Sequence, residues 1–344
     1  MKASPKFLAL TLITWGLLAQ SASAQVTIDS VTVDIQNVND PATGFGAVNY
    51  TYSIGKYEVT LNQYSAFLNA VAATDTYSLY NANMAANANI AGINRAGVSG
   101  SFSYSVTGTG DRPVTYVNWF DAARFVNWLQ NGQPTGLQVA GTTETGTYAL
   151  NGATSGLGFT RAGTGIYSLP SENEWYKAAY YDLSLNSGSG GYWKYPTRSN
   201  TQPNSRNGSG GDPNSANFRY DDSIVNGFNG GYAVNNSVLV PVGNALTDAG
   251  AFSLASSYYG TDDQGGNVYE WDDAVVGGTS RVYRGGAWNT FTSTLDSSLR
   301  NSTGPGAEVN NLGFRVIVPE PSAVGLMSIG FAALVLAWKR RRIH

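Results

Sequence analysis

The stretch Gly266-Asn267-Val268-Tyr269-Glu270-Trp271 is the segment of this sequence that says most about the fold. By itself it is a weak signal, as is any single short block, and Arg-Gly-Gly, for example, also occurs in simple turns. Its value comes from four further blocks that occur with it in an order and spacing that are hard to obtain by chance. These are Tyr57-Glu58-Val59-Thr60, Arg112-Pro113-Val114 with Asn118-Trp119, Leu169-Pro170-Ser171-Glu172-Asn173-Glu174-Trp175, and Arg284-Gly285-Gly286-Ala287-Trp288 with Leu312-Gly313-Phe314-Arg315.

Three of these blocks contain capping boxes and therefore predict helices. In each box a Thr, Asn or Ser is followed three residues later by a Gln, Asp or Glu, whose side chain can bond back to the cap. Most of these polar side chains are expected to be caps and nothing more. The pairs are Thr60 with Gln63, Asn118 with Asp121, and Ser171 with Glu174, and the apolar stripes behind them are Leu61, Tyr64, Leu68 and Val71; Trp119, Ala122, Val126 and Leu129; and Trp175, Ala178 and Ala179.

Short strands are predicted at 31–35, 48–54, 281–283 and 314–318, where apolar and polar residues alternate or glycine turns flank an apolar run. The stretches between these elements are small and polar, and 183–230 in particular is dense in Asn, Gly and Ser. Its interspersed aromatic residues favour a packed, irregular layer over a disordered linker.

The composition favours a loop-rich fold that packs around aromatic side chains. Of the 344 residues only 12% are charged, whereas Gly (41), Tyr (21) and Trp (8) are plentiful, which is not typical of a helical bundle. The chain has no cysteine, so no disulfide can stabilise it. Without the six basic residues of its two ends, 14 basic residues face 23 acidic ones. A charge of about −9 makes nucleic acid and anionic membranes poor partners.

Both ends of the chain predict export. Lys2 and Lys6 precede an apolar stretch from Phe7 to Leu18, and Ala22-Ser23-Ala24 offers a cleavage site, so residues 1–24 are interpreted as a signal peptide. At the other end, Val318-Pro319-Glu320-Pro321 precedes an apolar run, 322–338, of about 17 residues, which is the short end of the range for a membrane span. The basic residues 339–342 would hold that end in the cytoplasm.

This tail, residues 318–344, resembles the PEP-CTERM sorting signal. The resemblance implies that an exosortase-type protease recognises and removes it. The protein would be anchored transiently in the inner membrane and would then reach the cell surface or the extracellular matrix. The tail also carries His344, the only histidine, so the mature protein would have neither cysteine nor histidine.

Together the five blocks resemble the formylglycine-generating enzyme (sulfatase-modifying factor) family, over roughly Ile54 to Val318. The resemblance implies an irregular α+β domain of the C-type lectin-like superfamily, with little regular secondary structure for its size. We therefore expect one such domain at 25–317, with its core at about 54–317, between the signal peptide and the sorting signal.

The catalytic chemistry of that family is not expected here. The resemblance places the first copper-binding cysteine near Thr290 and the second within Phe291 to Ser298, and neither place has a sulfur. Copper(I) needs soft thiolate ligands, so no copper is expected. The iron-dependent sulfoxide synthases of the family use histidines, which are also missing. We therefore expect a protein that is not an enzyme of either kind.

Calcium is a different matter, because it needs only oxygen ligands. For the acidic residues concerned, the alternatives to binding calcium are a solvated acidic turn at Asp262-Asp263 and a buried salt bridge at Glu270. For a second calcium site, the spacing does not identify all the ligands, and Asn235 and Asn236 are guesses for the remaining ones. The resemblance implies a first calcium site at Asp263, Gly266, Val268 and Glu270, and a second that begins at Ala216-Asn217, with Asn217 and Phe218 as ligands.

Two further sets of charged residues have both a structural and a functional interpretation. Arg284 and Arg315 could attract an anionic ligand. The resemblance implies a structural role instead, because family proteins more often use these arginines to tie strands together. The pairs Asp221-Asp222 and Asp272-Asp273 could act as acid and base in glycan hydrolysis. Adjacent carboxylates in a strand point to opposite faces, which argues against that role.

The sequence favours a non-catalytic, calcium-stabilised binding module for exopolysaccharide or a surface protein, with exposed Tyr and Trp side chains stacking on sugar rings. One alternative is a divergent enzyme, which predicts a deep pocket lined by convergent ionisable groups. The other is a self-associating structural matrix protein, which predicts a flat surface.

Overall fold

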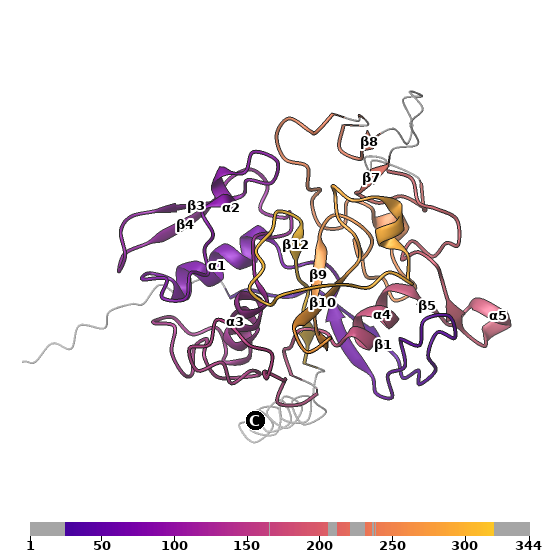
Figure 1. The fold of residues 1–344 in the computed structure, drawn as a ribbon, viewed down its shortest axis with the longest axis horizontal. Helices are drawn as coiled ribbons and strands as arrows, with labels where there is room; N and C mark the ends of the chain where they lie inside the picture. The colour runs from indigo at the N-terminus through magenta and orange to yellow at the C-terminus, as the bar shows by residue number, and fades with distance from the viewer. Residues whose placement is uncertain are drawn as a thin grey trace, which may run out of the picture.

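The computed structural model describes residues 25–164, 166–205, 212–220, 231–235, 237 and 239–319. In this part of the chain, short helices and strands are joined by long irregular loops (Figure 1). A four-stranded sheet near the middle of this view has the strand order β11-β10-β9-β12, with β12 parallel to β9 and the other pairs antiparallel. Its strands are β9 (Tyr269–Val276), β10 (Ser280–Arg284), β11 (Asn301–Thr303) and β12 (Leu312–Gly313).

A second sheet joins the two ends of the domain. Its order is β1-β2-β13, and both pairings are antiparallel. In the predicted run 48–54, regular strand begins only at Tyr52. Before it, Val48 forms an isolated bridge with Gln36. The predicted run 314–318 is likewise strand only in its last residues. The bounds are β1 (Ser30–Val33), β2 (Tyr52–Gly55) and β13 (Ile317–Val318).

All three predicted capping boxes are confirmed. Thr60 accepts a hydrogen bond from the Gln63 amide at 3.3 Å, and the Gln63 side chain accepts one from the Thr60 amide at 2.9 Å. The same reciprocal bonds form at the other two helices, because each cap satisfies amides that have no partner within a helix. The helices are α1 (Leu61–Val71), α3 (Trp119–Gln130) and α4 (Glu172–Tyr180).

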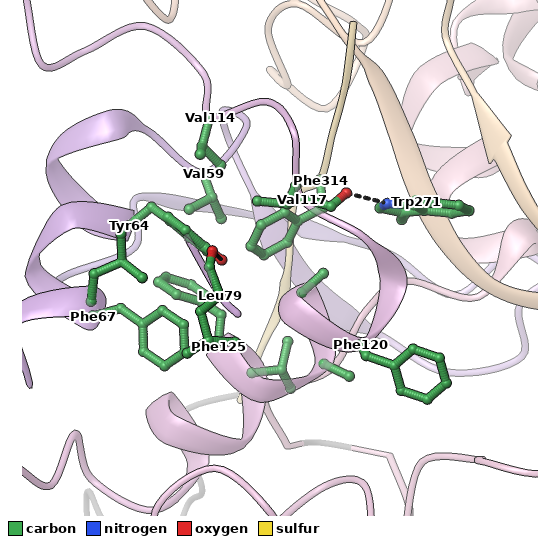
Figure 2. Packing of buried hydrophobic residues seen from close by; sticks show 14 of the residues in the cluster. Val59, Tyr64, Phe67, Leu79, Val114, Val117, Phe120, Phe125, Trp271 and Phe314 are labelled. Atoms are coloured by element: carbon green, nitrogen blue, oxygen red, sulfur yellow. Dashed lines mark hydrogen bonds between the residues drawn. The ribbon is translucent and has the colours of Figure 1, made fainter. Parts of the chain in front are cut away.

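The main core lies where α1 and α3 pack against the C-terminal strands (Figure 2). Tyr64, Phe67, Phe125 and Phe314 are fully buried and lie within ring-contact distance of one another in a mostly edge-to-face arrangement. Trp271 of β9 donates its indole N–H to the Val117 carbonyl at 3.0 Å, which ties the central sheet to the loop before α3. Aromatic packing thus takes the place of extended secondary structure.

The remaining elements are short and lie within the loops. They pair locally, as β3 with β4, β5 with β6 and β7 with β8. The α+β class with little regular secondary structure is therefore as predicted. The bounds are α2 (Asn83–Ala86), β3 (Ile93–Ala96), β4 (Ser103–Val106), β5 (Tyr181–Asp182), α5 (Leu185–Gly188), β6 (Gly191–Tyr192), β7 (Arg219–Tyr220), β8 (Gly231–Tyr232), and the 3₁₀ helices η1 (Ser253–Ala255) and η2 (Thr292–Leu295).

The predicted signal peptide, 1–24, and the predicted membrane segment, 322–338, lie outside the described residues. Within the described ranges, no helix has both the length and the apolar character needed to cross a bilayer.

Candidate functional site

The predicted first calcium site lies on the turn that leads into β9. Asp263, Gly266 and Asn267 all have positive φ angles, of 60°, 91° and 59°. A side chain at Gly266 would lie 2.3 Å from the Asn217 carbonyl oxygen, so the close approach of these two segments requires glycine. Gly266 and Val268 would offer backbone carbonyls and Asp263 and Glu270 would offer carboxylates.

The structure brings the starting residue of the predicted second site against this same turn. The Asn217 carbonyl accepts the Asn267 amide at 2.7 Å, and the Asn217 side chain donates to the Asn267 side-chain oxygen at 3.0 Å. Phe218 beside it is fully buried. Asn235 bonds within its own exposed loop, to Ser237 and Leu239, whereas Asn236 lies outside the described residues.

Glu270 forms a buried ion pair with Arg315, which was one of the two sequence-based interpretations of this carboxylate. The Arg315 Nη2 lies 2.7 Å from Glu270 Oε1, and the Trp175 indole donates to Oε2 at 2.7 Å. Arg315 also donates to the carbonyls of Gly55, at 2.9 Å, and Asp262, at 3.0 Å. It therefore ties strand ends together, in agreement with the structural role that the resemblance implied.

Arg284 has a comparable role at the far end of β10. It donates to Glu172 Oε1 at 2.7 Å and to the carbonyls of Ser297 and Leu299, at 3.2 and 2.8 Å. These bonds hold the start of α4, the strand and the loop before β11 together.

Glu58 is a member of this site that sequence reasoning missed. Its side chain is buried; Oε1 accepts from Asn267 Nδ2 at 3.2 Å, while Oε2 has no hydrogen-bond partner among the described residues. Burial, and then the negative charges of Asp263 and Glu270, raise the pKa of Glu58 well above its ordinary value. The only signal in the sequence was its place in the Tyr57–Thr60 block.

Among the described residues, the carboxylates around this turn outnumber the basic groups that pair with them. Burial, with further contributions from Asp262 and Glu270, raises the pKa of Asp263 to about 7, against the opposing effects of the Gly250 amide and Arg315. Three mutually repelling carboxylates thus face one buried arginine. An oxygen-only donor set with excess negative charge fits a hard divalent cation.

The described residues also limit how such a cation could be held. They contain no group of three or more acidic or histidine side chains arranged as metal ligands. A cation at this turn would therefore depend on the carbonyls of Gly266 and Val268 in addition to carboxylates, which is the mixed ligand set that the resemblance implied.

The position predicted for the first catalytic cysteine is a hydroxyl-capped turn. Thr290 Oγ1 accepts the Ala287 amide at 2.9 Å and lies 2.7 Å from Thr294 Oγ1, which is in η2. A side chain at Gly286 would lie 2.5 Å from Leu295, so η2 packs directly on this turn. The hydroxyls stabilise the loop where a thiol would be needed for copper.

A cavity of about 300 Å³ lies beside this turn. The Tyr269 hydroxyl is close to Thr290 and Thr294, and its ring meets the ring of Tyr283 edge to face, with centroids 4.9 Å apart. Apart from the tyrosines, the lining has no ionisable side chain. It consists of Tyr269, Tyr283, Thr303, Ala307, Val309, Asn310, Asn311 and Leu312.

The acidic pairs do not form a catalytic dyad in the described part of the chain. Asp221-Asp222 lies outside the described residues. On β9, Asp273 pairs with Arg281 at 3.0 Å, whereas both carboxylate oxygens of the fully buried Asp272 have no hydrogen-bond partner among the described residues. The two neighbours thus meet different surroundings, as expected for a strand.

The expectation of exposed aromatic platforms is wrong for the part of the chain that the structure describes. Every Tyr and Trp there is buried or half-buried, because these rings fill the space between loops. Some half-buried rings, such as Tyr57, Trp193 and Tyr283, form part of the wall of a cavity.

Comparison with known proteins gives a family match over most of the chain. The family described as sulfatase-modifying factor enzyme 1-like domain matches residues 20–319, and the PEP-CTERM protein-sorting motif matches residues 318–342. No curated protein matches the sequence.

Several solved structures are similar over most of their length. Treponema denticola variable protein 1 shares 17% identity, with a TM-score of 0.45, over 86% of this chain and 98% of that one. The protein CarF shares 21% identity, with a TM-score of 0.42, over 86% and 99%. PvdO from Pseudomonas aeruginosa shares 16% identity, with a TM-score of 0.42, over 85% and 92%.

Proposed function

The chain belongs to the family of sulfatase-modifying factor enzyme 1-like domains, and from that premise we propose that it is a calcium-stabilised, non-catalytic binding module for polysaccharide. Its sorting motif implies export, processing by an exosortase and a surface location. The catalytic cysteines of the family are absent, since the chain has no cysteine. A binding role is the function that remains for the family's architecture.

The observation that carries the proposal is the neutral cavity beside Thr290. Tyr283 offers a half-buried aromatic face, and Asn310, Asn311 and Thr303 offer neutral hydrogen-bonding groups. An aromatic face with amide and hydroxyl groups suits the C–H face and the hydroxyls of a sugar ring. A lining without carboxylate, lysine or histidine offers no strong general acid or base.

The role of calcium in this proposal is to hold the wall of the cavity in place. Bound calcium would supply positive charge to Glu58, Asp263 and Glu270 and would fix the turn that they share. Tyr269 is the first residue of β9, directly after that turn, and it lines the cavity. Sugar binding would therefore depend on calcium without any contact between the two.

The proposal is tested by co-sedimentation of the mature protein with the producing organism's own exopolysaccharide, with calcium and with a chelator. Saturable binding that the chelator weakens is expected. Tyr283→Ala should weaken binding about tenfold, because it removes the stacking face. Tyr167→Ala is the matched control, since Tyr167 is also half-buried against the main core but lies outside the cavity.

Equal binding by the Tyr283→Ala variant, or no binding by a folded and monodisperse protein, would exclude this cavity as the polysaccharide site. Copper-dependent oxidation of a cysteine peptide would exclude the non-catalytic role.

A further inference from the structure

A second cavity, of about 410 Å³, lies on the loops that follow β6 and shares no lining residue with the cavity beside Thr290. Its wall combines the half-buried ring of Trp193 with Leu254, which is 58% exposed, and Pro213. Arg198 is the only charged residue among the described residues of the lining. One flat aromatic face, apolar neighbours and a single cation therefore meet in one depression.

One buried carboxylate holds the ring and the cation side by side. Asp182 Oδ2 accepts the Trp193 indole N–H at 3.0 Å and the Arg198 Nε at 3.1 Å, and its other oxygen accepts the Ser184 amide at 2.8 Å. Although burial by itself raises the pKa of Asp182, the bonds from Ser184 and Trp193 and the charge of Arg198 lower it overall. Asp182 is thus ionised at neutral pH and orients both side chains before any ligand arrives.

The ion pair with Asp182 does not use all of the guanidinium. Asp182 engages Nε and Nη2 of Arg198, which leaves the Nη1 donors outside the pair. The side chain keeps 46% of its surface exposed. An arginine can donate to two carboxylates at once, because its five N–H groups point in different directions.

Among the described residues exposed positive charge is scarce, and two exposed basic residues, Lys194 and Arg198, follow Trp193 closely in sequence. Lys194 and Arg198 expose 51% and 46% of their side chains, more than any other basic residue in the described ion pairs. Arg124, Arg281 and Arg315, by contrast, are completely buried. On an acidic protein, a cavity with an exposed arginine is the place where an anion is least repelled.

We propose that this second cavity binds a carboxylated sugar, a uronate unit of an acidic polysaccharide. The pyranose ring would stack on Trp193 and contact Leu254, while its carboxylate would accept hydrogen bonds from Arg198. The inference rests on the proposed polysaccharide-binding function and adds the class of sugar. With two separate cavities, a long polymer could be held at two points, which raises its apparent affinity.

The test uses a short soluble probe, trigalacturonate, and its methyl ester, which has the same rings without the charge. Binding of each to the mature protein is measured by calorimetry at low ionic strength. We expect trigalacturonate to bind and the ester to bind at least about tenfold more weakly, because a charge-assisted hydrogen bond is worth about 1.5–3 kcal/mol, and tenfold corresponds to 1.4 kcal/mol. Raising the salt concentration should weaken the binding of trigalacturonate but not that of its methyl ester.

Two variants of matched charge localise the site. Arg198→Asn removes the cation, and asparagine tolerates the left-handed backbone at this position, where φ is 56°. It should reduce the affinity for trigalacturonate to that of the ester. Lys194→Ala removes the neighbouring exposed cation, which does not line the cavity, and should leave the affinity within about twofold. A thermal melt verifies that each variant is folded.

The outcomes separate this inference from the proposed function. If trigalacturonate and its ester bind equally, or if Arg198→Asn binds the acid as well as the unchanged protein does, the uronate site is excluded. The co-sedimentation result with exopolysaccharide can still stand in that case. If exopolysaccharide does not sediment with the protein but trigalacturonate binds through Arg198, the proposed function fails and the cavity is an isolated acid-sugar site.

Discussion

The turn that leads into β9 and the turn that follows β10 lie on neighbouring strands of one sheet, yet they hold different chemistry. The first concentrates the carboxylates of Glu58, Asp263 and Glu270 around Arg315. The second holds Thr290, whose hydroxyl accepts the Ala287 amide and lies 2.7 Å from the Thr294 hydroxyl. In this chain the turn before β9 holds buried charges, whereas the position predicted for the first catalytic cysteine carries a hydroxyl that caps its turn.

The largest effect on stability is expected at the first turn, when Glu270 is removed. Glu270→Ala removes the carboxylate that pairs directly with the buried Arg315 and should lower the free energy of unfolding by about 3–5 kcal/mol, measured by urea denaturation. Lys194→Ala, which breaks the exposed pair with Asp296, should leave the unfolding midpoint unchanged. A Glu270→Ala variant as stable as the unchanged protein would mean that the buried pair is dispensable.

The pH dependence of stability tests the charge imbalance at the first turn. The pKa of Asp263 in the folded protein, about 7, is higher than in the unfolded chain, so the folded state holds the proton more tightly. In chelator, this contribution is complete below about pH 4 and is lost as the pH rises through 7, at about 1.4 kcal/mol per unit of pKa difference. Glu58 acts in the same direction.

Thermal melts from pH 5 to 8, with chelator and with calcium, provide the measurement. Calcium should restore stability at pH 8, where Asp263 is ionised, and Asp263→Asn should reduce the slope of the profile in chelator. The chain's only histidine, His344, follows the sorting motif, and the processing that this motif implies would remove it from the mature protein. A melting temperature that rises with pH in chelator would contradict the assignment.

The smallest effect is expected at the second turn. Thr290→Ala removes the cap of the Ala287 amide and should cost about 1 kcal/mol in urea denaturation. Thr290→Ser should restore most of that loss, since it keeps the hydroxyl. A gain of copper binding by Thr290→Cys would show that the reactive position is still latent, which would contradict its interpretation as a purely structural turn.

The sequence was sufficient where one local interaction determines the structure. The capping boxes at Thr60, Asn118 and Ser171 needed only residues three positions apart, and the family and its irregular α+β fold followed from the motif blocks. Residues brought together over long sequence distances were not predictable. Glu58 bonds to Asn267 across 209 positions, and Trp193 and Leu254 line one cavity on loops without a repeating pattern.

The prediction of exposed aromatic side chains was wrong for a related reason. Composition shows that tyrosines and tryptophans are plentiful. It does not predict which faces of their rings remain accessible in the folded protein. In a fold with few long strands, these rings do the packing that a larger sheet would otherwise do. Some of the half-buried rings, such as Tyr283 and Trp193, line cavities.

The pairing of β13 with β2 limits the geometry of processing. The sorting motif begins at Val318, which is also the last residue of β13, so the fold and its release signal share a residue and have no spacer between them. Three residues of fully extended chain span at most about 10 Å. A cut near Pro321 would bring the exosortase almost into contact with the folded domain, and a flexible insert after Val318 should then speed release from the membrane.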